Sequence, residues 1–272
     1  MLRFARRGDI EYLVAENLQA LDFTVHAFCT RLGGVSEGPY ATLNAGFLAG
    51  DRDADVRRNL DLVSGSFAIP EGRLIQVRQV HGDRIVVIGD EGALPDNPPE
   101  GDGMITDRPG VALGIKTADC VPLLFVDRVR RVIGAAHAGW RGTSLDMAAK
   151  MIDAFVGRFS SRREDVLVAI GPAIGPCCYQ VDSPVHERFL SRWNAVNFLM
   201  PCREEGRWML DLALANRSQL VEAGVPDGNI VSADLCTACR KDLFFSHRAD
   251  HGRTGRQINF LMLRDRIHLK NA

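Results

Sequence analysis

Two histidines and one cysteine carry side chains that could bind a zinc-like metal ion. His81 lies in the segment QVHG, Cys120 in TADCVP and His137 in HAGWRG. Two imidazoles and one thiolate leave the fourth position of a tetrahedral zinc ion open, which distinguishes a catalytic zinc from a structural one. The residue types therefore suggest a catalytic centre in which water or substrate completes the coordination.

The three residues are far apart in sequence, unlike the compact ligand spacing of a zinc finger. Each one lies at the end of, or just after, an expected strand and beside Gly or Pro, where an irregular backbone can direct side chains into a cleft. Taken singly, each histidine is better read as a hydrogen-bonded structural residue, and Cys120 as part of the core. The joint site therefore depends on the family resemblance described below.

Length, charge and cysteine content indicate which classes of partner and which compartment to expect for this chain. The 272 residues favour one large domain spanning 1–272, and 33 Lys plus Arg against 34 Asp plus Glu give a net charge of −1. Such a balance offers no bulk attraction for nucleic acid or acidic membranes. With no signal peptide or membrane span recognised, we expect a cytoplasmic protein. The odd count of seven cysteines favours thiols or metal ligands over a disulfide framework.

Short apolar, β-branched runs predict a core made mainly of sheet. Several runs are apolar throughout, which is typical of sheets covered on both faces. The expected strands are 23–28, 74–77, 84–88, 111–115, 122–126, 132–136, 166–170 and 257–262. Few helices accompany them, so we predict a mixed α/β sandwich rather than a doubly wound fold. No G-x-G-x-x-G follows a strand, which argues against a dinucleotide cofactor.

Helical periodicity and end signals predict three helices. They are 144–155 with Thr143 or Ser144 as the cap, 212–223 with Asp211 as the cap and Gly224 as the stop, and a shorter helix after Ser183-Pro184. Residues 89–103 are rich in Pro, Gly and acidic side chains and are predicted to be a loop, with a lid as one interpretation.

Four further cysteines form two local pairs. Cys236 and Cys239 form a C-x-x-C, which is half of a zinc site or a redox pair. No second C-x-x-C supplies the other two thiolates, and no thioredoxin-like setting surrounds it. Cys177 and Cys178 follow a rigid Gly-Pro turn, and we interpret them as structural or loop thiols. His247 and His251 lack the glutamate of H-E-x-x-H and are left out of the metal site.

The motifs together strongly resemble the bacterial YfiH family, whose members are called laccase-domain proteins, peptidoglycan editing factors and purine nucleoside phosphorylases. The resemblance runs in order along nearly the whole chain. The matching segments are 30–40, 79–82, 101–106, 116–122, 137–142, 171–179 and 244–248. One position departs: His247 stands where many relatives are expected to have tyrosine.

The resemblance implies an α/β/β/α sandwich like the cysteine-hydrolase domain of cytotoxic necrotizing toxins. It also implies zinc held by His81, Cys120 and His137. The implied reactions are phosphorolysis of adenosine, inosine and methylthioadenosine to the free base and (methylthio)ribose 1-phosphate, and deamination of adenosine. The implied partners are therefore a purine nucleoside and phosphate.

Roles for polar residues follow as hypotheses. Asp119, beside Cys120, is a candidate proton carrier for deamination by zinc-activated water. Arg141 precedes the first expected helix, where it is read equally well as a phosphate ligand or as a solvated turn residue. Phosphate would be held by Arg141 together with one of three other cations, Arg31, Lys116 or Arg248.

Three alternatives use the same cleft differently. In the first, Cys120 is a nucleophile and His137 its base, hydrolysing an amide of a cell-wall precursor. In the second, copper replaces zinc in a polyphenol oxidase. Seven histidines without an H-x-H repeat disfavour a multicopper cluster. In the third, zinc merely braces a binding module, which three ligands rather than four disfavour.

Overall fold

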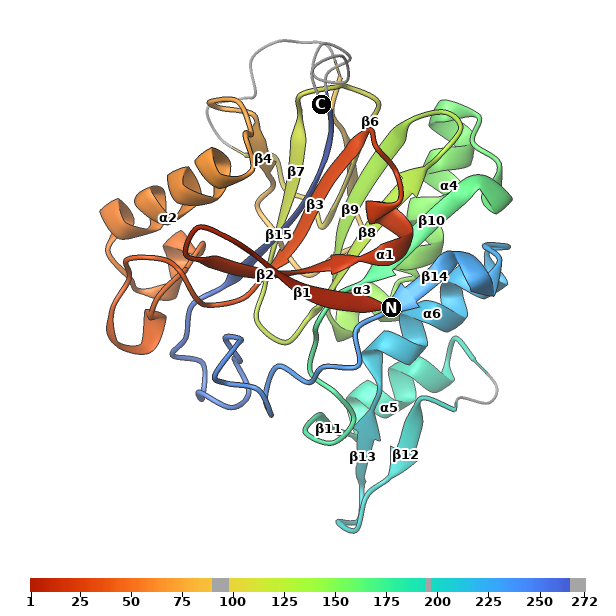
Figure 1. The fold of residues 1–272 in the computed structure, drawn as a ribbon. Helices are drawn as coiled ribbons and strands as arrows, with labels where there is room; N and C mark the ends of the chain where they lie inside the picture. The colour runs from red at the N-terminus through yellow and green to blue at the C-terminus, as the bar shows by residue number, and fades with distance from the viewer. Residues whose placement is uncertain (90–97, 194–196, 265–272) are drawn as a thin grey trace.

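Two six-stranded sheets lie face to face in the structure, a computed structural model that describes residues 1–89, 98–193 and 197–264 (Figure 1). The first sheet contains, in spatial order, β1 (Leu2–Arg7), β2 (Ile10–Ala15), β3 (Thr24–Cys29), β15 (Gln257–Leu263), β7 (Ala112–Thr117) and β4 (Leu74–Gln76). The second contains β14 (Ile230–Ser232), β10 (Val166–Ile170), β8 (Val121–Asp127), β9 (Val132–Ala138), β6 (Gly103–Thr106) and β5 (Ile85–Val87). A three-stranded sheet contains β11 (Gln180–Asp182), β13 (Arg207–Leu210) and β12 (Leu199–Pro201).

Helices cover the outer faces of the two large sheets, with α2 on one side and α4 and α6 on the other (Figure 1). The α-helices are α1 (Glu16–Gln19), α2 (Asp53–Ser66), α3 (Trp140–Ser144), α4 (Met147–Phe159), α5 (Ser183–Leu190) and α6 (Leu212–Glu222). Short 3-10 turns occur at Gly38–Tyr40, Phe47–Ala49, Arg163–Asp165 and Asp227–Asn229. The layers are thus helix, sheet, sheet and helix, which confirms the expected α/β/β/α sandwich.

Strand β8 shows why residues 121–126 are all apolar. Leu124 and Val126 pack between the two sheets, whereas Leu123 and Phe125 pack on the opposite face, in the core that α4 and α6 cover. A strand with both faces buried has no position for a solvated side chain. Each such Leu, Val or Phe contributes roughly 1.5–3 kcal/mol by leaving water.

Both large sheets are mixed, as the sequence predicts. Most neighbouring strands are antiparallel, but β4–β7, β5–β6 and β10–β14 are parallel. All eight strands expected from apolar runs are present, with ends shifted by two residues or fewer. Strands β1, β2 and β6, the three-stranded sheet, and β14 were not predicted.

The helix predicted at 144–155 is in fact two helices. Helix α3 begins at Trp140, and α4 begins at Met147 after Asp146, which has φ +64. The predicted caps are wrong because Thr143 and Ser144 lie inside α3.

Helices α5 and α6 confirm the other two predictions. The carboxylate of Asp211 accepts a hydrogen bond from the N–H of Leu214 at 2.9 Å, which caps α6 as expected.

The expected loop and the expected lack of a membrane span can be compared with the structure only over the described residues. Residues 90–97 of the predicted 89–103 loop lie outside the described residues, and Gly103 already belongs to β6. Among residues 1–89, 98–193 and 197–264, no helix is long and apolar enough to cross a membrane.

Candidate metal and substrate site

The three proposed ligands, His81, Cys120 and His137, come together in the folded chain. Their ligand atoms all lie within 4.8 Å of one another. The imidazole rings meet edge to face, with centroids 4.8 Å apart and an interplanar angle of 86°. The folded chain therefore brings together the three side chains that the sequence singled out.

Neighbouring strands place two of these ligands. Cys120 lies immediately before β8 and His137 lies near the end of β9, and these strands are paired so that Pro122 is opposite His137. His81 follows β4 in a tight turn with φ +59. The side chain of Gln79 in the same turn exchanges two hydrogen bonds with the backbone of Lys116 on β7, which fixes the turn against the sheet.

Exposure increases from one ligand to the next. His137 is buried, Cys120 is half-buried and His81 is exposed. The ligand atoms thus converge where the core meets solvent, and the His81 side is open to water or substrate.

Asp102 orients two of the three ligands and was missed by sequence reasoning. Its fully buried carboxylate lies 2.8 Å from Nδ1 of His137. It also accepts hydrogen bonds from the N–H groups of Val80, His81 and Gly82, at 3.2, 3.0 and 2.7 Å. Because a carboxylate accepts the Nδ1 proton, Nε2 of His137 remains available for a metal ion. The one feature of the sequence that could have pointed to Asp102 is its position between two glycines, Gly101 and Gly103.

The charges in this cluster favour a thiolate. Burial alone would raise the pKa of Cys120, but the charge and hydrogen bonding of His137, together with those of His81, lower this pKa below its ordinary value. Burial would likewise lower the pKa of His137, whereas Cys120 and Asp102 raise it. The thiolate is the form of cysteine that binds metals and attacks carbon, so the site suits either chemistry.

Two glycines of the HAGWRG segment permit this close packing. A Cβ at Gly139 would lie 2.9 Å from Sγ of Cys120 and 3.4 Å from Cδ2 of His81. A Cβ at Gly142 would lie 2.9 Å from the carbonyl oxygen of Gly82. The motif therefore uses glycine where two loops meet at the ligands.

Asp119 connects the Cys120 turn to two distant loops. Its carboxylate accepts hydrogen bonds from Oγ1 of Thr237 and the N–H of Arg248, both at 2.7 Å. Its carbonyl oxygen accepts from the N–H of Ile174 at 2.9 Å. The residue has φ +88 and is buried, so it is fixed on all sides.

Tyr179 lies among the charged groups of the site. The guanidinium of Arg248 stacks over its ring at 5.0 Å from the centroid. Burial, and then the negative charge of Cys120, raise the pKa of Tyr179, while the charges of Arg248 and Arg141 oppose that rise. Arg141 and Arg248 therefore both influence Tyr179 electrostatically, and Arg248 is in direct contact with its ring. Tyr179 was part of a quoted motif but was given no role.

The other two proposed phosphate ligands have protein partners, as does Arg248, whose guanidinium donates to the carbonyl oxygen of Gln180 at 3.0 Å. Arg31 donates to the carbonyl oxygens of Ala41 and Lys241 at 2.7 and 3.0 Å. Nζ of Lys116 donates to Oε1 of Gln76 at 2.8 Å, and burial lowers the pKa of this amine to about 8.

Arg256 is a further cation that the sequence did not single out. Burial lowers the pKa of Arg256, and the charges of Cys120 and Asp119 oppose that change. Its guanidinium donates to two nearby carbonyl oxygens.

Comparison with known proteins identifies the family. Residues 25–264 match the family model described as multi-copper polyphenol oxidoreductase laccase. A protein named purine nucleoside phosphorylase YlmD, from Geobacillus stearothermophilus, is 42% identical over 249 residues, which cover 89% of this chain and 90% of the relative. This chain belongs to the YfiH family. The resemblance inferred from the motifs is thereby confirmed.

Solved structures of YfiH-family proteins share the fold. The crystal structure of YlmD from Geobacillus stearothermophilus superposes with a TM-score of 0.88 at 37% identity, covering 96% of this chain and 98% of that one. The crystal structure of a Bacillus licheniformis hypothetical protein YfiH also gives 0.88, at 36% identity, covering 97% and 99%. The α/β/β/α arrangement is therefore common to this chain and these YfiH-family structures.

Proposed function

We propose that this YfiH-family chain is a zinc-dependent purine nucleoside enzyme. It would phosphorolyse adenosine, inosine and methylthioadenosine to the free base and (methylthio)ribose 1-phosphate, and would also deaminate adenosine. The observation that carries the proposal is the convergence of His81, Cys120 and His137 at a solvent-open site. The naming of the relatives supports the choice of substrate. The same proposal treats residues 1–272 as a single catalytic domain.

The ligand set fits zinc. One thiolate and two imidazoles are borderline-soft ligands, and Asp102 holds His137 in the tautomer that a metal requires. Among the described residues, the only other cluster of metal-binding side chains consists of cysteines, so a multicopper centre lacks the histidines it needs. Zinc bound at this site would supply a Lewis acid and lower the pKa of a coordinated water.

Arg141 and Arg248 are the proposed phosphate ligands. Both lie close enough to influence Tyr179 electrostatically, and a guanidinium can hold phosphate through two parallel hydrogen bonds. Their role would be to position phosphate against the sugar and to stabilise its charge. Arg31 and Lys116 remain in the proposal as supporting cations. The guanidinium of Arg248 also donates to the carbonyl oxygen of Gln180 at 3.0 Å, but it is placed first because it lies over the ring of Tyr179.

Asp119 is the proposed proton carrier for deamination. Each carboxylate oxygen accepts one hydrogen bond, from Thr237 or Arg248, and keeps a second lone pair for a proton. Those two bonds would hold the carboxylate in place next to Cys120 while it transfers the proton.

A cysteine hydrolase is the second candidate, and one observation favours it. Cys120, His137 and Asp102 form a continuous chain of interactions like that of a Cys-His-Asp triad. In this case the Cys120 thiolate would attack the amide of a cell-wall precursor and His137 would transfer the proton. Stoichiometric zinc that blocks alkylation of Cys120 would exclude this alternative.

The decisive assay incubates the zinc-loaded protein with adenosine and phosphate and quantifies adenine, ribose 1-phosphate and inosine. We expect all three products, and we expect C120S to lower kcat at least about 100-fold because a metal ligand is lost. The matched control is C202S, which alters a thiol outside the site and should retain full activity. Absence of every product from protein with one zinc at this site would refute the proposal.

A further inference from the structure

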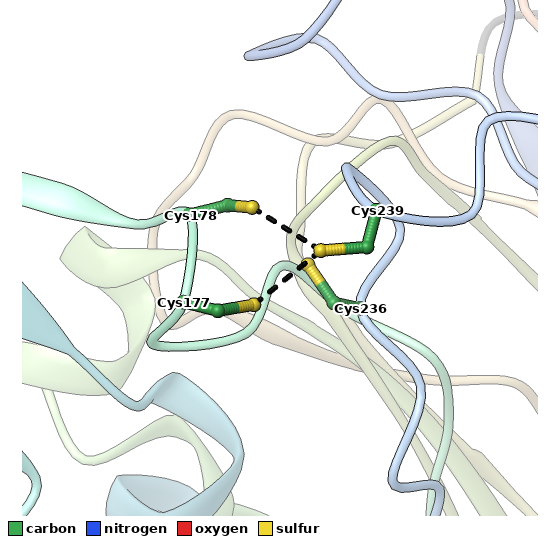
Figure 2. Close-up of side chains that lie close together, drawn as sticks. All are labelled: Cys177, Cys178, Cys236 and Cys239. Atoms are coloured by element: carbon green, nitrogen blue, oxygen red, sulfur yellow. Dashed lines mark hydrogen bonds between the residues drawn. The ribbon is translucent and has the colours of Figure 1, made fainter.

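Four cysteines from two distant loops meet at a second cluster, away from the three ligands described above. Cys177 and Cys178 lie between β10 and β11, and Cys236 and Cys239 lie between β14 and β15. Their four sulfur atoms point toward one another and all lie within 4.8 Å (Figure 2). The sequence contains no second C-x-x-C, but folding places the adjacent pair Cys177 and Cys178 beside the first one.

The spacing of the sulfur atoms matches tetrahedral metal coordination. Sγ of Cys239 lies 3.6 Å from Sγ of Cys177 and 3.4 Å from that of Cys178. Four sulfurs arranged tetrahedrally around zinc, each at about 2.3 Å from the ion, would be about 3.8 Å apart. All four cysteines are free thiols in the structure, so every sulfur can act as a ligand.

The backbone around the cluster supports a metal-bound thiolate. The N–H of Gly175 donates to Sγ of Cys236 at 3.2 Å, and hydrogen bonds to ligand atoms of this kind orient metal sites. A Cβ at Gly175 would lie 3.3 Å from Cβ of Cys236 and 3.4 Å from Sγ of Cys177. The backbone at Gly175 therefore packs tightly against Cys236 and Cys177.

We propose that Cys177, Cys178, Cys236 and Cys239 form a second zinc site, with four thiolate ligands and a structural role. Four protein ligands close the coordination sphere, which is the pattern of structural rather than catalytic zinc. The site is separate from the one that His81, Cys120 and His137 form, and the proposal does not depend on the nucleoside activity.

The second site would fasten two loops that form part of the first. The loops already touch where Thr237 N–H donates to the carbonyl oxygen of Ala173 at 3.0 Å. Thr237, between the two cysteines of the C-x-x-C, also holds the carboxylate of Asp119. Tyr179 directly follows Cys178, and Arg248 belongs to the other loop. A zinc ion here would therefore fix the distance between Tyr179 and Arg248.

Zinc counting provides the first test. The full-length protein, loaded with zinc and freed of excess by gel filtration, is analysed for metal by mass spectrometry alongside C239S and C177S. These two substitutions are chosen because Cys239 and Cys177 are exposed, so serine should be tolerated. We expect each variant to hold one zinc fewer per chain than the wild type, whereas the control C202S should hold the same amount.

A second measurement distinguishes the two proposed zinc sites. The C120S variant, which lacks a ligand of the first site, is loaded with Co²⁺, and we expect the intense visible absorption of a tetrahedral cobalt thiolate. The double variant C120S/C239S should lose this absorption while its circular dichroism stays unchanged. Failure of the nucleoside assay would leave both expectations intact.

Two results would overturn the proposal. One is an equal zinc content in the wild type, C239S and C177S. The other is a disulfide among the four cysteines in protein purified without oxidant, detected by peptide mass mapping, because a bonded pair cannot supply two thiolates.

Discussion

Gly139 is the residue on which the geometry of the first site depends most directly. It separates Cys120 from His81 at a point where even one methyl group would have to displace a ligand. The Cys120 side chain is half-buried and is hydrogen-bonded to His137, so a shift of its sulfur would disturb that contact. The position is therefore constrained by the ligands rather than by backbone conformation.

We predict that G139A lowers zinc affinity at the first site by roughly 10-fold or more, with a parallel loss of activity. The matched control is G157A in α4, where a Cβ would meet nothing within 4 Å. That change should raise stability by about 0.5–1 kcal/mol, because alanine suits a helix interior better than glycine. Competition with a chromogenic chelator measures the affinity. Equal zinc affinity in the two variants would contradict this view of Gly139.

The sequence allowed the three candidate ligands to be named, but not the residues that surround them. His81, Cys120 and His137 belong to motifs that resemble those of the YfiH family, and their convergence was expected from that resemblance. Asp102 could not be assigned, because its function comes from one imidazole and three backbone N–H groups that only the fold brings near. The cysteine cluster was missed for the same reason, since its two pairs are far apart in sequence.

At the scale of elements, α2 stabilises the loop that carries the motif at residues 30–40. The buried side chain of Asn59 accepts from the N–H of Val35 at 2.8 Å and donates to Ser36, Thr42 and Asn44. On the opposite side of the first sheet from β8, Phe67 packs edge to face on Tyr12 and Phe260. The helix thus holds the loop in place, and Phe67, which directly follows the helix, packs on the sheet.

We predict that N59A lowers the free energy of unfolding by roughly 2–4 kcal/mol, since it leaves several buried backbone groups without their partner. R58A, an exposed change on the same helix, should stay within about 0.5 kcal/mol of the wild type. Urea denaturation followed by circular dichroism measures both. A loss in N59A no larger than that in R58A would show that the loop finds other partners.

Elements differ in how readily the sequence reveals them. The strands buried on both faces, such as β8 and β10, were predicted because residues 121–126 and 166–170 are all apolar. Helix α2 was not, because its sequence is mostly polar and only Val56, Asn59 and Val63 are buried in it. The break between α3 and α4 was also missed, since it depends on the left-handed backbone of Asp146.

At the scale of the whole molecule, one buried histidine links stability to pH. Nε2 of His26 on β3 accepts a hydrogen bond from the N–H of Ala15 at 2.8 Å, and the side chain is 5% exposed. Burial lowers the pKa of His26 from 6.5 to about 4. The folded protein therefore keeps this ring neutral at pH values where the unfolded chain is protonated.

We predict that His26 lowers the stability of the protein as the pH falls from about 6.5 to about 4, and has no further effect below that range. Above 6.5 both states are neutral, so the linkage vanishes there. Between pH 7 and pH 5 the loss from this residue is about 2 kcal/mol. Urea denaturation of the wild type and of H26Q, each at pH 7 and pH 5, measures the part of this loss that comes from His26. The same pH dependence in both proteins would assign the effect to other groups.

A mixed α/β sandwich was predictable from sequence because several apolar runs must be buried on two faces, whereas the α/β/β/α layers were expected from the family resemblance. The positions of Tyr179, Arg248 and Arg256 could not be predicted from sequence, because these residues lie on irregular segments between strands (Figure 1). Such segments follow no periodicity and are placed by single hydrogen bonds, such as the one from Arg248 to Asp119.

The pairing of β8 with β9 implies an order of assembly for the first site. Only residues 128–131 separate the two strands, so Cys120 and His137 approach one another by closing a short hairpin. His81 arrives separately, through the contact of Gln79 with β7 in the other sheet. Nearby contacts form at lower entropic cost than distant ones. In a newly made chain, Cys120 and His137 would thus come together first, and the exposed His81 would complete the site last.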